Sequence, residues 1–428
     1  MAVAKDFPLE KLLSGWGLNG AKDILIWPGY AKKLSKLCSR GNLEYMKDFL
    51  IVSYCLESSF YLDRESLEKL KEFTNSRLKE PIDTGETPEQ EEMELMFDKY
   101  IGSTPMCGAM NRLYCEYFFD DECVGDLNSI VAEMFDSFED MFNGEEWMSD
   151  EGKAACIEKL RAIRVHIAYQ DFESVDYSKL DIKSREEGGN FLEAYFDSKR
   201  FAALHIAERL GAPYDINYWD PIAPGLSTTV TNAAYNPSTN GIYIFAGVCE
   251  APMYSLDMSY EEKLAGLGAV VGHEITHGFD NKGVLYDKDG IKNSDWMPAA
   301  DQGMFVDRSE KVGQHVSTIK PFPGSGLYDG RKVTAELTAD MGGMKVTLMM
   351  AKKHPGFDYD RYFMARASDW RTNVPIEVES SRLSQDPHPL NFLRINIPHQ
   401  QFEEFYSTYN ITENDRMYIE PGKRIAVW

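Results

Sequence analysis

The sequence of 428 residues lacks the segments that direct a protein to a membrane or hold it there. No stretch approaches the roughly 18 consecutive apolar residues of a membrane-spanning helix. The first residues, Met-Ala-Val-Ala-Lys-Asp-Phe-Pro, contain no apolar core of signal-peptide length. We therefore expect a soluble, cytoplasmic protein with no membrane segment and no visible export signal.

Cysteine and positive charge are also scarce. The seven cysteines are an odd number without a Cys-x-x-Cys pair, and none follows Cys249. This pattern favours reduced thiols over a disulfide framework or a zinc–thiolate site. The formal net charge of −24 argues against nucleic acid as a partner, because no basic surface would offset phosphate repulsion.

Hydrophobic residues, in contrast, are abundant enough for large cores, at 43% of the chain with 23 Phe, 23 Tyr and 7 Trp. Residues 1–200 place apolar side chains at helical spacing between charged ones, which predicts a nearly all-helical region. The segments expected to be helices include 43–56, 65–80, 89–100, 128–142 and a helix from Ser149 to about His166. A segment rich in Pro, Gly and Thr at 81–88 is expected to be a loop.

The composition changes near residue 210, where Pro- and Gly-rich sequence begins. Segments 227–232 and 241–246 are short, rich in β-branched or aromatic residues, and flank the turn sequence Asn236–Gly241, so we expect a hairpin. The predicted organisation is a helical lobe at 1–210 and a second domain at 211–428, to which the lobe contributes packing. The predicted class is mainly α, of the α+β type, with a short mixed sheet.

The most informative stretch is Gly272-His-Glu-Ile-Thr-His-Gly-Phe-Asp280. On a helix, His273 and His277 project from one face and can hold a single ion, with Glu274 beside it. Zinc held by two imidazoles keeps a position open for water, and a neighbouring carboxylate can take the proton of that water. The stretch therefore predicts a catalytic zinc site.

The flanks of this motif favour a helix. Ser259 and Glu262 have the spacing of a capping box, an apolar stripe follows them, and Gly278 is a suitable C-terminal stop. With 8 His in the chain, the pattern His-Glu-x-x-His would arise by accident in about 1 chain in 100 of this composition. The alternative is a polar helix face with two solvated histidines, so a metal site needs a further ligand.

A second expected helix, at 334–353 with Thr334 as its N-cap, carries Glu336 and Asp340 four residues apart. Zinc enzymes with this motif take the third ligand from a few places. A His ten residues after the first is excluded because position 283 is Gly. A downstream helical Glu, with an acid four residues later to orient an imidazole, fits both carboxylates. The glycines at 342–343 would let another helix approach closely.

These two helical patterns, together with several other segments, resemble the neprilysin and endothelin-converting-enzyme family of zinc peptidases. The matching segments are Thr231–Pro237, Val271–Asp280, Glu336–Gly343 and His388–Asn396, with weaker matches at Arg424–Trp428, Arg112–Phe119 and Trp147–Glu151. The similarity is strong from about residue 210 onward and traceable from about residue 20. It implies a thermolysin-like catalytic domain and a zinc-dependent endopeptidase that hydrolyses peptide bonds of oligopeptides.

The resemblance also implies roles for individual residues around one Zn²⁺ per chain. His273, His277 and Glu336 would be the ligands, and Glu274 the general base on the zinc-bound water. Asp340 would hold one ligand imidazole and Asp280 the other, which fixes tautomer and basicity.

Further roles concern the peptide substrate. His388 would donate to the tetrahedral oxyanion, and Arg394 would position the peptide near the primed subsites. Asn232 and Ala233 would bind the substrate backbone beside an edge strand at 241–246. An apolar wall formed by Val270, Phe279 and Trp370 would favour a hydrophobic residue after the scissile bond. The remaining histidines are expected to be structural or surface residues: His166, His205, His315, His354 and His399.

The chain departs from the family pattern in two ways. The family members that work outside cells end in Cys-Arg-Val-Trp, whereas Ile425–Trp428 contains no Cys. Only 272 residues precede His273, so the helical lobe is expected to be a shortened lid. The lid could be naturally small, completed by a partner chain, or truncated. The alternative function is accordingly a catalytically weak or inactive zinc-binding, peptide-binding scaffold, or a subunit that needs a second chain.

Overall fold

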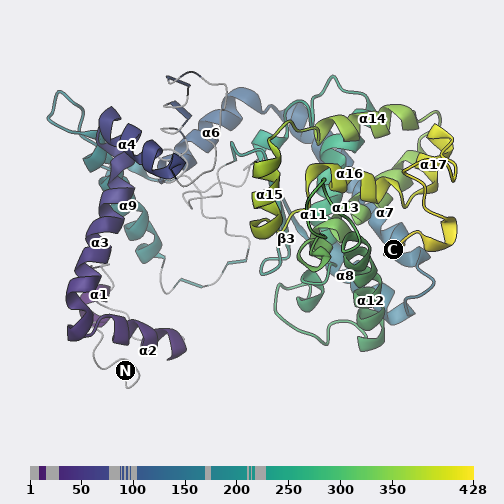
Figure 1. Ribbon diagram of the computed structural model, residues 1–428, viewed down its shortest axis with the longest axis horizontal. Coiled ribbons are helices and arrows are strands. Elements are labelled where there is room, and N and C mark those ends of the chain that lie inside the picture. The colour runs from purple at the N-terminus through teal and green to yellow at the C-terminus, as the bar shows by residue number, and fades with distance from the viewer. Residues whose placement is uncertain are drawn as a thin grey trace. The chain divides into compact units, whose positions relative to one another are not determined.

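The computed structural model describes residues 9–15, 28–76, 87, 89–90, 93–94, 97, 104–168, 175–209, 212–213, 215–216 and 228–428. The chain forms two compact units (Figure 1). Unit 1 comprises residues 1–112 and 172–227, and unit 2 comprises residues 113–171 and 228–428. The expected class, mainly α with a short mixed sheet, is confirmed.

All the regular elements in the described residues of unit 1 are helices. Its elements are α1 (Leu9–Gly15), α2 (Pro28–Leu37), η1 (Arg40–Asn42), α3 (Leu43–Ser58), η2 (Ser59–Tyr61), α4 (Arg64–Asn75), η4 (Tyr177–Lys179) and α9 (Phe191–Glu208). α6 (Met106–Phe118) includes the boundary at residue 112. Tyr61 stacks on Tyr195 of α9 at 3.9 Å between ring centroids. The helices expected at 43–56 and 65–80 correspond to α3 and α4, whereas segments 81–88 and 89–100 lie mostly outside the described residues.

Unit 2 contains a three-stranded sheet and the long helices. The elements before the motif helix are α7 (Asp121–Gly144), α8 (Asp150–Arg161), β1 (Arg164–Ile167), β2 (Ala233–Asn236), β3 (Gly241–Ile244), η5 (Ala246–Val248), α10 (Tyr260–Lys263) and the π-helix η6 (Leu264–Gly268). Those from the motif helix onward are α11 (Ala269–His277), η7 (Gly283–Leu285), α12 (Ala299–Val316), α13 (Gly330–Lys353), α14 (Tyr359–Asp369), α15 (Ile376–Gln385), α16 (Asn391–His399), α17 (Glu403–Tyr409) and η8 (Pro421–Lys423).

The sheet has the order β1-β3-β2, with β1 parallel and β2 antiparallel to β3. The expected hairpin is present, but its first strand is 233–236 and not 227–232. Asn236 pairs with Gly241 across the turn, so the residues immediately before the turn lie opposite β3. The segment at 241–246 was expected at an edge of the sheet. It forms the central strand, and β2 is an edge strand.

The expected helix from Ser149 to His166 ends earlier. The Ser149 hydroxyl does cap α8 by accepting from Gly152 N, but the helix stops at Arg161. Residues 164–167 instead form β1, because their backbone groups pair with β3 more than 70 residues later in the chain. This pairing places His166 in a strand, where it stacks on Tyr243 at 4.7 Å between ring centroids.

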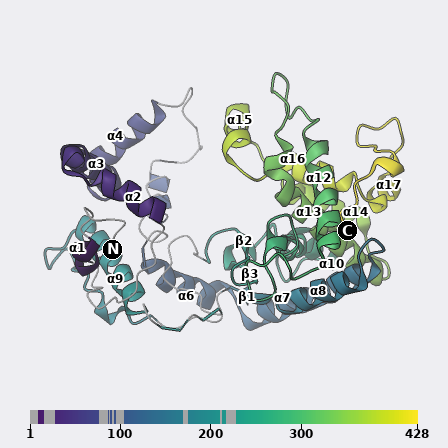
Figure 2. The ribbon, with the colours of Figure 1, turned by 90° about the horizontal axis from the view of Figure 1, so that it is seen from below.

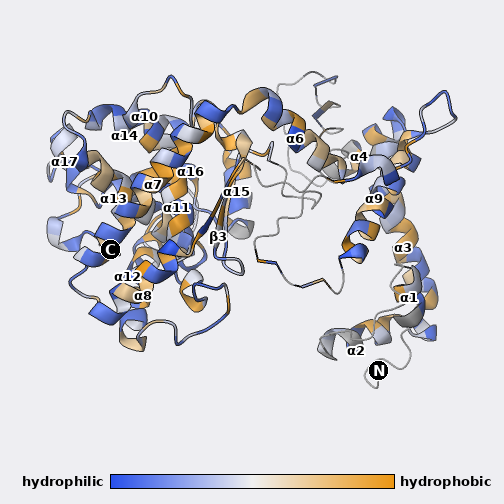
Figure 3. Cartoon of the chain, turned by 180° about the vertical axis from the view of Figure 1, so that it is seen from behind, coloured by the Kyte–Doolittle hydropathy of each residue, from blue (hydrophilic) through white to orange (hydrophobic). Residues whose placement is uncertain are grey.

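Helix α13 lies at the centre of unit 2, packed by α7, α11, α12 and α16. α7 and α8 run along one side of this unit next to the sheet (Figure 2). Apolar residues concentrate on the inward faces of these helices (Figure 3), including the fully buried Phe138, Ile275, Leu337 and Met344. The resulting core fixes the helices that carry the motif residues.

The division into units differs from the single boundary expected at residue 210. Residues 113–171 pack with the C-terminal half of the chain, because β1 pairs with β3 and α7 packs on α13. Among the described residues, no helix is both long enough and apolar enough to cross a membrane.

Candidate active site

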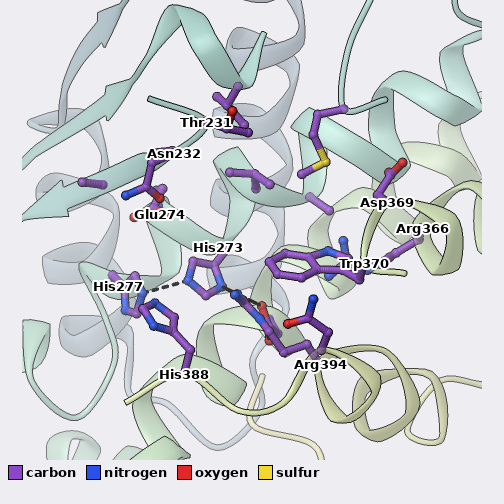
Figure 4. Close-up of a pocket in the computed structure, with 18 of the residues that line it drawn as sticks. Thr231, Asn232, His273, Glu274, His277, Arg366, Asp369, Trp370, His388 and Arg394 are labelled. Carbon is purple, nitrogen blue, oxygen red and sulfur yellow. Dashed lines mark hydrogen bonds and ion pairs between the residues drawn. The ribbon is translucent and has the colours of Figure 1, made fainter. Parts of the chain in front are cut away.

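Three side chains from two helices of unit 2 converge on one point. His273 and His277 come from α11, and Glu336 comes from the second turn of α13. The two Nε2 atoms are 2.9 Å apart, and Glu336 Oε2 lies 3.4 Å from that of His273 and 3.5 Å from that of His277. Figure 4 shows both imidazoles at the cavity wall. The ligand atoms lie within 4.8 Å of one another, close enough to share an ion.

Glycines allow the two helices to come this close. A Cβ at Gly343 of α13 would lie 2.6 Å from Ala269 O and 2.8 Å from His273 N of α11. A Cβ at Gly272 would lie 2.8 Å from Gly343 Cα. Larger residues would force the helices apart, and with them the His and Glu side chains. α13 itself begins at Gly330, so Thr334 is not its N-cap; the Thr334 hydroxyl donates to Gly330 O inside the helix.

Each imidazole is oriented by a carboxylate. Nδ1 of His273 lies 2.8 Å from Asp340 Oδ1, and Nδ1 of His277 lies 2.7 Å from Asp280 Oδ2. The other oxygen of Asp280 accepts from the backbone N–H groups of Lys282 and Gly283. Because Nδ1–H donates to a carboxylate, the lone pair of each Nε2 points at the shared centre.

Arg394 of α16 pairs with the same Asp340. Its Nε and Nη2 donate to Asp340 Oδ2 and Oδ1 at 2.9 and 2.7 Å, and the guanidinium lies 4.0 Å above the Trp370 ring. Burial raises the pKa of Asp340, but Arg394 and His273 outweigh it and hold the pKa well below its ordinary value. Arg394 lines the cavity, so it can act on a ligand and on the carboxylate that orients His273.

The chemistry of these three side chains fits zinc. Two neutral imidazoles and a carboxylate are a common ligand set for catalytic zinc with an open position. Glu336 Oε2 is buried without a hydrogen-bond partner among the described residues. It faces the Nε2 atoms of the two imidazoles, and the Nδ1 atom of each imidazole already binds a carboxylate. Burial raises the pKa of Glu336, but both imidazoles hold it far below its ordinary value. Burial lowers the pKa of His277, but Asp280 and Glu336 raise it to about 10, so a metal ion that binds here displaces a proton from this imidazole. The cluster thus attracts positive charge.

A cavity of about 550 Å³ opens beside the cluster. Of the residues predicted from the sequence, those that line it are Asn232, Ala233, Val270, His273, Glu274, His277, Asp340, Trp370, His388 and Arg394. The buried Asp280 lies behind His277 instead, and Glu336 reaches the cluster from α13. Phe279 was expected in the apolar wall, but it packs in the core against Phe142 at 4.8 Å between ring centroids. Phe279 lies in the turn after the end of α11 at His277, where helix periodicity does not predict the direction of a side chain.

Several lining residues were missed by sequence reasoning. They include Tyr235, Val248, Met253, Arg366, Asp369 and Asn391. Burial raises the pKa of Asp369 to about 6, although nearby Arg366 opposes the shift, and Asp369 Oδ2 has no hydrogen-bond partner in the described part of the chain. Both belong to α14, three residues apart, and no metal-site motif includes them.

His388 lies at the cavity with an acidic partner that was also missed. Its Nδ1 is 2.8 Å from Asp386 Oδ1, and its Nε2 is 3.4 Å from Glu336 Oε2. About half of the His388 side chain is exposed, so it can meet a ligand. The sequence Asp386-Pro-His388 held the only available signal, a carboxylate two residues before the histidine.

Two imidazoles and a carboxylate on two close-packed helices form the ligand set expected of a gluzincin-type zinc site. Comparisons with known proteins point to the same class of protein. Models of peptidase family M13 match residues 1–170 and 232–425. The neutral endopeptidase of Lactococcus lactis subsp. lactis (strain IL1403) is 30% identical over 319 residues, which cover 74% of this chain and 48% of the relative. Neprilysin-11 of Caenorhabditis elegans is 24% identical, covering 96% and 48%.

Solved structures give the same result. The crystal structure of PepO from Lactobacillus rhamnosis HN001 matches with a TM-score of 0.80 at 25% identity, covering 92% of this chain and 60% of that one. Zinc metalloprotease Zmp1 of Mycobacterium tuberculosis, solved with an inhibitor, matches in fold with a TM-score of 0.82 at 23% identity, covering 99% and 64%. The chain belongs to peptidase family M13, the neprilysin family of zinc metallopeptidases. It spans about half the length of the curated relatives it matches.

Proposed function

We propose that this chain is a zinc-dependent endopeptidase that hydrolyses peptide bonds of oligopeptides. The observation that carries the proposal is the His273–His277–Glu336 cluster, with both imidazoles oriented by carboxylates, at the wall of a cavity that also contains Glu274. One Zn²⁺ held there would polarise the scissile carbonyl and lower the pKa of a water molecule. Side chains of this protein would bind the substrate, transfer the proton and stabilise the developing charge.

The substrate backbone binds along β2. This edge strand pairs with β3 on one side, and Ala233, Ala234 and Tyr235 line the cavity. An extended peptide can add to such an edge through main-chain hydrogen bonds, with Asn232 at the start of the strand. Val270 and Trp370 supply apolar surface for the residue after the scissile bond, and Asp369 places a carboxylate in the same cavity.

Glu274 and His388 carry the proton and charge steps. The Glu274 carboxylate takes a proton from the attacking water and returns it to the leaving nitrogen. In its doubly protonated form, His388 donates from Nδ1 to Asp386 and from Nε2 to the oxygen that becomes negative in the transition state. Arg394 orients the substrate while its bond to Asp340 keeps His273 in place.

Cleavage of an internally quenched peptide, with and without a chelator, tests this function. Glu274→Gln should keep its zinc, because Glu274 is not in the ligand cluster, and should lose about 10²–10⁴-fold in kcat. If wild type and Glu274→Gln are equally inert at full zinc occupancy, the endopeptidase proposal is wrong. A zinc-binding, peptide-binding scaffold would then be the better description.

A subunit role is the second candidate, favoured by the surface of α3 in unit 1. This helix exposes Phe49, Leu50, Ile51 and Val52, each by 55% or more. Large apolar side chains exposed on one helix are typical of protein contacts, and a partner chain that completes the lid would cover them. Light scattering on protein from its source would reject this candidate if a fully active species has the 48.7 kDa mass of one chain.

The cysteines support a reducing compartment, and we propose the cytoplasm. All seven are free thiols, and Cys107, Cys156 and Cys249 are buried. Burial raises the pKa of Cys115 to about 11, which keeps this thiol protonated and unreactive. Fractionation of the source cells, followed by detection of the protein, tests the location.

A further inference from the structure

A buried lysine lies behind the candidate zinc site, outside the cavity. Lys159 of α8 is fully buried. A buried ammonium is costly unless all of its three N–H groups find acceptors. The structure provides them: Nζ donates to the backbone carbonyls of Gly278 and Gly283 at 2.6 and 2.8 Å, and to that of Tyr286 at 2.6 Å.

The three carbonyls belong to one short segment, residues 278–286, which follows the motif helix directly. The same segment carries Asp280, whose Oδ1 accepts from the N–H groups of Lys282 and Gly283 and whose Oδ2 holds His277. Lys159 therefore binds backbone C=O groups of this turn, and Asp280 binds backbone N–H groups of the same turn. Gly283 takes part in both contacts.

The packing around this turn leaves little room for other arrangements. A Cβ at Gly283 would lie 1.8 Å from His277 O, so the turn presses against the end of α11. The indole of Trp296 lies 4.8 Å from Lys159 Nζ, and its N–H donates to Val284 O. Asn240, at the turn before β3, donates to Lys159 O, which ties this part of α8 to the sheet.

We propose that Lys159 is a positioning residue of the zinc site. By holding the three carbonyl oxygens of segment 278–286, it fixes Asp280 and, through Asp280, the orientation of the His277 imidazole. Lys159 belongs neither to the cavity lining nor to the ligand cluster. The inference rests on the proposed zinc site, but it concerns metal binding and does not require peptidase activity.

Lys159→Met tests the role, because Met keeps much of the length of the side chain and cannot donate. The matched control is Lys153→Met, another lysine of α8 that donates to a single carbonyl, that of Asn143. The zinc dissociation constant of each full-length protein is measured by competition with a chromogenic chelator. Loss of a group that orients a ligand typically costs 10–100-fold in metal affinity, so we expect about a tenfold weaker site in Lys159→Met and less than a threefold change in Lys153→Met.

A merely structural role would lower the thermal midpoint of the zinc-free protein and leave zinc affinity unchanged. A double-mutant cycle with Asp280→Asn adds a second criterion. If Lys159 acts through Asp280, the double variant should bind zinc no more weakly than Asp280→Asn alone. Additive losses would overturn the proposed route through Asp280.

Lys159→Gln covers the case in which the Met variant does not fold, because its amide retains two N–H donors. It should fall between wild type and Lys159→Met in zinc affinity. A Gln variant that folds and binds zinc as wild type does would overturn the proposal, and so would unfolding of both variants in the presence of zinc. Wild-type protein that binds no zinc would refute the proposed function. Equal zinc binding by wild type and Lys159→Met would refute only the role of Lys159.

Discussion

Arg394 and Asp340 form a two-bond ion pair in the interior of unit 2, with Nε and Nη2 donating at 2.9 and 2.7 Å. Asp340 is 1% exposed and Arg394 8%, so neither charge is solvated by water. The same carboxylate receives Nδ1–H of His273. This ion pair thus couples α16 to the His273 imidazole of α11 through a side chain of α13.

Removing the guanidinium should therefore affect both stability and metal binding. Arg394→Met leaves Asp340 buried with one partner, and breaking a buried pair in this way costs about 3–5 kcal/mol of unfolding free energy. We expect a lower urea midpoint and about tenfold weaker zinc binding. Without the guanidinium, the Asp340 carboxylate that accepts from His273 is no longer held in one orientation. Arg371→Met, at a nearby exposed position, is the control. Unchanged zinc affinity in Arg394→Met would contradict the coupling.

The close approach of α11 and α13 predicts a large effect from a single methyl group. Gly343→Ala would place Cβ 2.6 Å from Ala269 O, a backbone atom that cannot rotate away. We expect a loss of about 1–3 kcal/mol, as for other overpacked interiors, together with weaker zinc binding as the helices separate. Gly125→Ala, on α7 with open space around it, should instead be neutral or stabilise by up to about 1 kcal/mol. Urea unfolding of both variants measures the contrast.

Zinc should protect one unit and not the other. The ligand cluster lies wholly in unit 2, and binding to the native state alone stabilises it by about 4 kcal/mol when free zinc is 1,000 times the dissociation constant. Hydrogen-exchange mass spectrometry with and without a chelator should therefore show slower exchange in α11 and α13 when zinc is bound. Peptides from α3 and α4 should exchange equally in both conditions. Equal protection of the two units would contradict a site confined to unit 2.

Asp369 predicts a pH dependence of stability. Its pKa of about 6 in the folded protein lies above its ordinary value of 3.8, because burial disfavours the carboxylate. The contribution of protonated Asp369 to the free energy of unfolding is therefore complete below pH 3.8 and is lost as pH rises through 6. Asp369→Asn cannot ionise, so its thermal midpoint should rise relative to that of wild type as pH increases from 4 to 7. Asp307→Asn, at an exposed position of α12, should follow the wild-type curve. A constant difference between Asp369→Asn and wild type across this range would contradict the prediction.

Residues that share a short sequence pattern could be placed from the sequence alone. His273, His277, Glu336 and Asp340 lie in two short helical patterns, so their spacing already placed them on common faces. The pairing of Arg394 with Asp340 joins residues 54 positions apart, and no local pattern predicts it.

Two element boundaries that the sequence did not predict also depend on contacts with distant segments. β1 has four residues and is defined by a parallel partner far along the chain, so a helix was expected through His166. α13 begins one turn before Thr334, at a glycine whose Cβ would lie 1.9 Å from Gly313 O of α12. Packing between helices, and not capping preference, sets that boundary.

The contact between Asp386 and His388 leads to a prediction about catalysis. Asp386 Oδ1 lies 2.8 Å from Nδ1 of His388 and also accepts from the His388 backbone N–H. Under the proposed mechanism, this carboxylate keeps Nε2 aimed at the developing oxyanion. Asp386→Asn should therefore lower kcat by about 10–100-fold with little change in KM, because the interaction strengthens only in the transition state.

Zinc affinity separates this effect from damage to the metal site. Asp386 does not contact His273 or His277, so Asp386→Asn should bind zinc within threefold of wild type, whereas Asp340→Asn should not. His388→Ala should lose at least as much in kcat as Asp386→Asn, and the double variant should be no worse than His388→Ala alone, because both substitutions remove one function. A normal kcat in Asp386→Asn, or losses that add in the double variant, would show that His388 acts without its carboxylate.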